Sequence, residues 1–72
     1  MFAMRYKQIG AKIVYYRMLK SMTQEQLAEK AGISASYLSK IEHGKYAKNL
    51  PFTTLLLIAQ ALDVDVCEII KE

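Results

Sequence analysis

The sequence predicts an all-α fold, a compact arrangement of five short helices. Three observations lead to this prediction. Apolar residues recur at helical spacing along most of the chain, two short segments carry their own helix start and stop signals, and strand-like windows are brief. At 72 residues the chain suffices for one small domain, which we expect to span residues 1–72. The helices are expected at approximately residues 6–20, 24–31, 35–43, 51–62 and 66–71.

The first helix is predicted from one apolar face. Ile9, Ile13 and Tyr16 stand at positions i, i+4 and i+7, which share one side of a helix. Val14 and Met18 fall roughly opposite. This helix therefore has a core-facing side and a second apolar side whose role the pattern leaves open.

The second and third helices are predicted from their ends. Thr23 followed by Gln26 is the signature of a capping box, in which each side chain satisfies a backbone amide at the helix start. Gly32 can adopt the left-handed conformation that ends a helix. Ser34 is a favoured N-cap for the next helix, and Gly44 is expected to end it. The sequence thus predicts two short helices joined by one tight turn.

Apolar residues on these two helices can face one another across the turn. They are Leu27, Ala28 and Ala31 on the first helix of the pair, and Leu38 and Ile41 on the second. Ala28 is small where a crossing helix must come close. This pattern is typical of a helix-turn-helix, whose second helix fits the major groove of DNA.

The last two helices are predicted from apolar positions and from proline and aspartate. Pro51 suits the first turn of a helix, and Asp63 or Asp65 can cap the helix that follows. The apolar side of the fourth helix is expected to consist of Phe52, Leu55, Ile58, Ala59 and Leu62. The fifth helix has Val66, Ile69 and Ile70 as its apolar positions.

Charge is distributed unevenly along the chain. The net charge is +3, but residues 1–48 hold nine Lys or Arg against three Glu, which gives +6. Residues 49–72 hold Lys71 against Asp63, Asp65, Glu68 and Glu72, which gives −3. A merely soluble surface does not require this separation, whereas attraction of one end to phosphate explains it.

Composition excludes some classes of protein. The single cysteine, Cys67, rules out an intramolecular disulfide, and no charged-then-apolar leader with a cleavage site is present. The longest aliphatic run, residues 55–59, is far below the roughly 20 residues that cross a bilayer. We therefore expect a cytoplasmic protein that does not associate with a membrane.

The dispersed pattern resembles the helix-turn-helix of the lambda-repressor-like (Cro/XRE) DNA-binding domains. The matching residues are Thr23-Gln24, Leu27-Ala28, Gly32-Ile33-Ser34, and Ile41-Glu42 with Gly44-Lys45. The resemblance extends upstream to Ile9-Gly10, Ile13 and Arg17, and downstream to Leu55 and the run from Ile58 to Val64. It covers about residues 9–70, and it implies a five-helix fold that binds double-stranded DNA.

Candidate base-reading residues lie on the third helix, opposite Leu38 and Ile41. Alignment to the family places Ser34, Ala35, Ser36 and Lys40 at base-reading positions, and helical geometry adds Ser39. Lys40 can donate to guanine, the serines can bond to several base edges, and Ala35 can contact a thymine methyl. This set holds no Arg, Asn or Gln for bidentate contacts, so no operator sequence is predicted.

Candidate phosphate contacts flank the same helix. Gln24 stands at the start of the second helix, where unpaired amides and the helix dipole favour an anion, and the resemblance implies a phosphate contact there. His43, Lys45 and Lys48 follow the third helix and fit a flanking DNA strand. Tyr37 either reaches a phosphate or packs as an ordinary aromatic residue.

The resemblance also implies a structural ion pair between Arg17 and Glu42. In the family the matching positions tie the first helix to the end of the third. Both residues flank apolar faces, so the loss of one partner would leave a partly buried charge.

We expect a symmetric homodimer, because helix-turn-helix proteins usually need two copies to read half-sites about 34 Å apart. By family resemblance the end formed by the fourth and fifth helices is the first choice of interface. Its candidate residues are Leu57, Val66, Cys67 and Ile70. The outer side of the first helix is the second choice.

The predicted function is a sequence-specific transcriptional regulator of bacterial, phage or plasmid type, which acts as a homodimer on a palindromic operator. A phage-type repressor, a restriction–modification controller and an antitoxin remain open. The alternative is a protein-interaction module that keeps the fold but acts through apolar surfaces. Enzymatic activity is not expected, because Cys67, His43 and the carboxylates fall on separate elements. No cofactor, metal or small-molecule ligand is predicted.

Overall fold

The computed structural model describes residues 2–45 and 50–71, with the backbone alone for residues 2–4. In these residues it contains five α-helices and no strand, so the all-α prediction is confirmed. In chain order the helices are α1 (Phe2–Leu19), α2 (Gln24–Ala31), α3 (Ala35–Glu42), α4 (Phe52–Leu62) and α5 (Val66–Ile70).

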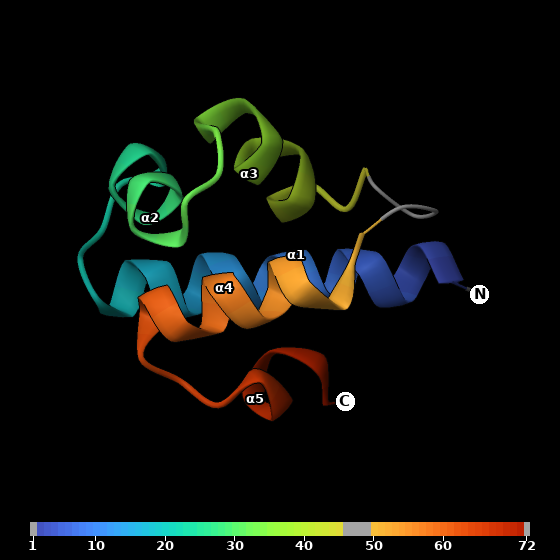
Figure 1. The fold of residues 1–72 in the computed structure, drawn as a ribbon. Coiled ribbons are helices and arrows are strands. Elements are labelled where there is room, and N and C mark those ends of the chain that lie inside the picture. Colours follow the sequence, from blue (N-terminus) through green and yellow to red (C-terminus); the bar gives the residue numbers. More distant parts are fainter. Residues whose placement is uncertain (1, 46–49, 72) are drawn as a thin grey trace.

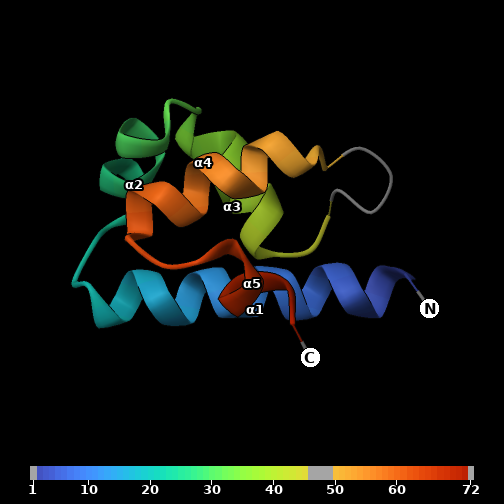
Figure 2. The ribbon, with the colours of Figure 1, turned by 60° about the horizontal axis from the view of Figure 1, so that its bottom comes forward.

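The helices surround one apolar core. Figure 1 shows α2 and α3 on one side of α1 and α4, and α5 on the other side. Helix α2 packs on α3 and α4, α1 packs on α3 and α5, and α5 lies against both α1 and α4 (Figure 2). Every helix contributes to the fully buried side chains, which are Ile13, Leu27, Leu38, Ile41, Ile58, Leu62 and Ile69.

The predicted start and stop signals of α2 and α3 are confirmed. Thr23 Oγ1 accepts from the Gln26 amide at 3.0 Å, and Gln26 Oε1 accepts from the Thr23 amide at 2.8 Å. Gly32 ends α2 with a φ of 76°. The Ser34 hydroxyl oxygen caps α3 by accepting from the Tyr37 amide at 3.0 Å, and Gly44 follows α3 with a φ of 71°. The turn between the two helices is therefore fixed by local contacts.

Helix α1 begins at Phe2, earlier than the predicted start near residue 6. Residues 2–5 contain no proline or glycine that would stop a helix. The Arg5 guanidinium also donates to Gln8 Oε1 at 3.1 Å and to the Ile70 carbonyl oxygen. These contacts stabilise the early turns and join them to the end of α5.

The sequence predicted Pro51 in the first turn of α4, but Pro51 precedes the helix. It occupies the N-cap position with an extended ψ of 144°, and its carbonyl oxygen accepts from the Thr54 amide at 3.1 Å. Phe52 was predicted to face the core but is 54% exposed. The first turn of α4 starts at the edge of the core, so Phe52 remains about half exposed.

The two candidate caps for α5 have different roles. Asp65 caps α5, since its carboxylate accepts from the Cys67 amide at 2.9 Å. This hydrogen bond lowers the pKa of Asp65 from its ordinary value. Asp63 instead ends α4, in the left-handed conformation with a φ of 59°.

Helices α1 and α3 approach closely at Gly10. A Cβ added to Gly10 would lie 2.5 Å from the carbonyl oxygens of both Ile41 and Glu42. Real Cβ atoms do not come so close to backbone oxygens, so only glycine fits here without movement of one helix. The absence of a side chain at Gly10 thus allows the end of α3 to approach α1 this closely.

We expect Gly10→Ala to lower the free energy of unfolding by about 1–3 kcal/mol, because the added methyl overpacks the contact with α3. Helix propensity alone predicts the opposite sign, since alanine is favoured over glycine by about 1 kcal/mol inside a helix. Urea denaturation checks this, with Ala11→Ser at the exposed neighbouring position as the control. A Gly10→Ala protein as stable as wild type would refute the close approach.

Candidate nucleic-acid interface

Helix α3 presents a polar ridge to solvent while its opposite side is buried. Leu38 and Ile41 are buried towards α2 and the core. Ser36, Lys40 and His43 are exposed and stand at positions i, i+4 and i+7, along one side of the helix and its C-cap. We call these three residues the α3 ridge. A helix of eight residues with one such ridge has the dimensions to enter a major groove.

The other candidate base-reading residues flank the ridge. Ser34 is exposed, but its hydroxyl oxygen already caps α3. Ala35 and Ser39 are half-buried, and Ala35 packs partly against the core. The structure thus brings together five predicted residues on or beside one face, with Ser36 and Lys40 the most outward of them.

The candidate phosphate contacts fall into two groups. His43 and Lys45 are exposed in the turn after α3. His43 Nδ1 lies 2.7 Å from the Ser39 carbonyl oxygen. Because a carbonyl oxygen only accepts, Nδ1 carries the hydrogen, and Nε2 is the ring atom left for a ligand. Tyr37 is half-buried and packs partly against the core, and Lys48 lies outside the described residues.

Arg17 and Glu42 form a two-pronged ion pair. Arg17 Nε donates to Glu42 Oε2 at 2.7 Å, and Nη2 donates to Oε1 at 3.2 Å. The third guanidinium nitrogen of Arg17, Nη1, donates to the Met22 carbonyl oxygen at 2.9 Å. The Glu42 side chain is 3% exposed and that of Arg17 is 15% exposed, so both charges are largely removed from water. The pair joins α1, the turn before α2, and the end of α3.

Gln24 completes this cluster, a contact that the sequence did not indicate. Its Nε2 donates to Glu42 Oε1 at 2.7 Å. The carboxylate therefore fixes the amide group with its nitrogen towards α3, because an amide oxygen would be repelled there. This bond uses one of the two hydrogens of that nitrogen.

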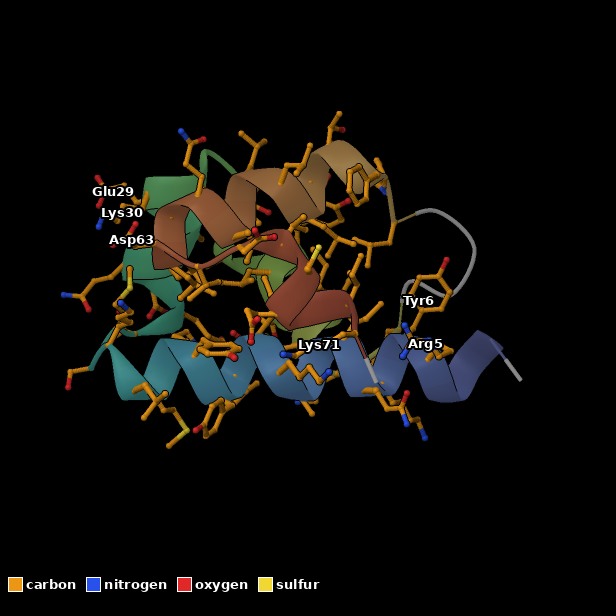
Figure 3. The ribbon with its side chains drawn as sticks, turned by 90° about the horizontal axis from the view of Figure 1, so that it is seen from below. Arg5, Tyr6, Glu29, Lys30, Asp63 and Lys71 are labelled. Carbon is orange, nitrogen blue, oxygen red and sulfur yellow. The ribbon has the colours of Figure 1, made fainter. Side chains whose placement is uncertain are left out.

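Helix α5, which carries Glu68, lies on the other side of α1 and α4 from α3 (Figure 1). Glu68 on α5 accepts from Lys71 Nζ at 3.2 Å and from the Tyr16 hydroxyl at 3.3 Å. The hydrogen bond and charge of Lys71 lower the pKa of Glu68. Figure 3, seen from below, shows Lys71 on this side and Asp63 with Glu29 and Lys30 where α2 meets the end of α4.

The candidate dimer residues differ in exposure. Leu57 is 45% exposed and Cys67 is exposed, while Val66 and Ile70 are half-buried. Phe52 and Leu56 are two further exposed apolar residues on α4, and neither was predicted for the interface. The second-choice surface on α1 exposes Tyr15, Met18 and Leu19.

Among the described residues, no group of three or more His, Cys, Asp or Glu side chains is placed to hold a metal ion. None of the described helices combines the length and the apolar composition of a membrane span.

Comparisons with known proteins agree with this geometry. A family model described as Helix-turn-helix matches residues 13–69. The immunity repressor protein of Bacillus phage phi105 is 42% identical over 64 residues, which cover 89% of this chain but only 43% of that repressor. An uncharacterized helix-turn-helix-type transcriptional regulator of Sinorhizobium fredii, y4dJ, is 36% identical over 89% of this chain and 80% of its own length.

A solved structure is similar over almost its whole length. The restriction–modification controller protein C.AhdI from Aeromonas hydrophila superposes with a TM-score of 0.83 at 30% identity. The match covers 89% of this chain and 94% of that protein. Five helices in this order and spacing therefore recur in a controller protein of similar size.

We expect Arg17→Met to lower the free energy of unfolding by about 3 kcal/mol or more, because Glu42 would keep its burial and lose its counter-charge. The double variant Arg17→Met with Glu42→Leu should be less destabilised than the single variant, since no buried charge remains. Urea denaturation of the three proteins measures both effects. A loss below about 1 kcal/mol in the single variant would mean that the pair behaves as a surface ion pair.

Proposed function

Because this chain belongs to the Cro/XRE-type helix-turn-helix family, we propose that it is a sequence-specific regulator of transcription that binds double-stranded DNA. The observation that supports this most is the α3 ridge of Ser36, Lys40 and His43. The helix that bears it is held by its buried side against α2 and the core, so the ridge projects as a rigid unit. In this proposal α3 enters the major groove and the ridge faces base edges.

Lys40 is the main base-reading residue in this proposal. Its ammonium can donate to O6 and N7 of guanine, whereas Ser36 can bond to several bases. Ser34, Ala35 and Ser39 contribute contacts at the edge of the ridge. Specificity is therefore expected to be concentrated at the base pairs that Lys40 reaches.

Phosphate contacts on both sides of the groove hold α3 in register. On one side, Gln24 offers its second amide hydrogen beside the unpaired backbone amides at the start of α2. On the other side, His43 and Lys45 lie in the turn after α3, and Lys48 follows them in the chain. Such contacts orient the protein without reading sequence.

The functional form is proposed to be a homodimer on a palindromic operator. The exposed residues Leu57 and Cys67, with the half-buried Val66 and Ile70 beside Cys67 on α5, support this proposal because they offer apolar area to a second copy. Two copies related by a two-fold axis would place two α3 ridges on successive major grooves.

A protein-interaction module is not favoured as the main function. The relatives above are named as a repressor, a transcriptional regulator and a controller, and the cations on the α3 side suit phosphate rather than an apolar partner. We propose that the protein acts without enzymatic activity, in the cytoplasm where its DNA lies.

We expect selection from a random duplex pool to enrich one sequence class, and Lys40→Ala to relax the preference at the positions that Lys40 reads by about 1–3 kcal/mol. Gln24→Ala should instead weaken binding to all duplexes alike. Fluorescence anisotropy with selected and scrambled duplexes measures both, with Lys30→Ala on the far end of α2 as a charge-matched control. If the pool shows no enrichment, the regulator proposal fails.

Leu57→Asp is expected to raise the dimer dissociation constant by about tenfold or more, because an unpaired carboxylate would enter an apolar interface. Sedimentation equilibrium at micromolar concentration measures this. Met18→Asp, on the exposed side of α1, is the matched control and should leave association unchanged. If Met18→Asp alone dissociates the dimer, the interface lies on α1 instead. If the wild-type protein is a monomer, the homodimer proposal is wrong.

A further inference from the structure

The first turns of α1 lie against the end of α3. Lys7, Gly10 and Arg17 stand at positions i, i+3 and i+10, which share the side of α1 that faces α3. Gly10 lies under the carbonyls of Ile41 and Glu42, and Arg17 pairs with Glu42. Of these three residues, Lys7 is nearest the N-terminus of α1. It lies beside the turn that follows α3.

Gly44 is the residue that Lys7 meets. A Cβ added to Gly44 would lie 2.8 Å from Lys7 Cγ and 2.9 Å from Lys7 Cα. The stem of Lys7 is therefore packed on the turn that ends α3, between His43 and Lys45 in the sequence. The rest of the side chain is exposed, and Lys7 forms no ion pair with any described carboxylate.

Lys7 thus packs against a turn whose residues on either side of Gly44, His43 and Lys45, are both exposed. The C-terminal end of α3 carries a partial negative charge, which reduces the cost of bringing Lys7 close to Lys45. The stem of Lys7 packs on Gly44, but the side chain as a whole remains exposed to solvent. A phosphate on the flanking DNA strand would supply its missing counter-charge.

We propose that Lys7 is a further phosphate contact, which extends the DNA interface from the helix-turn-helix onto the first turns of α1. The proposal rests on the DNA-binding function proposed above and deepens it. Lys7 lies outside residues 13–69, the part of the chain that the family model matches. The contact is therefore a feature of the N-terminal turns of this chain, and it adds affinity without sequence preference.

Three variants separate charge from packing. Lys7→Met keeps the Cγ that lies against Gly44 and removes the ammonium, whereas Lys7→Arg keeps a cation. Lys20→Met removes the same charge from the other end of α1, where Lys20 lines a surface hollow with Lys30 and Asp63. Thermal unfolding of each variant verifies that the fold is retained.

The readout is the slope of log K against log salt for a fluorescent duplex of mixed sequence. We expect Lys7→Met to reduce the magnitude of this slope by about 0.9 per bound chain, which is about eightfold weaker binding at 0.1 M salt if binding at 1 M is unchanged. Lys7→Arg should match wild type, and Lys20→Met should retain the wild-type slope.

Two results would overturn the proposal, and they are distinguishable. If wild type binds with a steep salt dependence while Lys7→Met and Lys20→Met behave alike, the Lys7 contact is refuted and DNA binding stands. If wild type binds no duplex at low salt, both the contact and the proposed function fail.

Discussion

The arrangement of the first three helices depends on the interactions of the buried Glu42 carboxylate with Arg17 and Gln24. Arg17 reaches it from α1 and Gln24 from α2, while Glu42 itself stands in the last turn of α3. A charge so deeply removed from water is tolerated only when hydrogen bonds and a counter-charge compensate it, and here both are present. Alternative packings of the three helices would leave the carboxylate without these partners, so the cluster favours a single relative placement.

This placement matters because α2 and α3 are only eight residues long each. Helices of that length are marginal in isolation and owe their stability to caps and tertiary packing. Capping by Thr23 and Ser34 satisfies the helix starts, and the apolar sides of both helices are buried in the common core. The buried side of α3 thus holds the helix in place, while Ser36, Lys40 and His43 on its other side are exposed to solvent.

Local signals in the sequence were sufficient for the elements but not for the contacts between distant residues. The capping box, the left-handed Gly32 and the helical spacing of apolar residues each act within a few positions, so α2 and α3 were predicted closely. The bond from Gln24 to Glu42 joins residues 18 positions apart, and no pattern in the chain marks it. The exposure of Phe52 and the contact of Lys7 with Gly44 depend likewise on where a helix ends relative to its neighbours.

The bond from Arg5 to the carbonyl of Ile70 joins the first helix to the last. Helix α5 has five residues and would not persist alone, yet its Ile69 is fully buried and its end is held by α1. Fraying at either end of the described chain therefore breaks contacts at the other end as well. Because contacts join the first helix to the last, gradual unfolding from either terminus is disfavoured. The fold is instead expected to be lost in one cooperative, all-or-none transition.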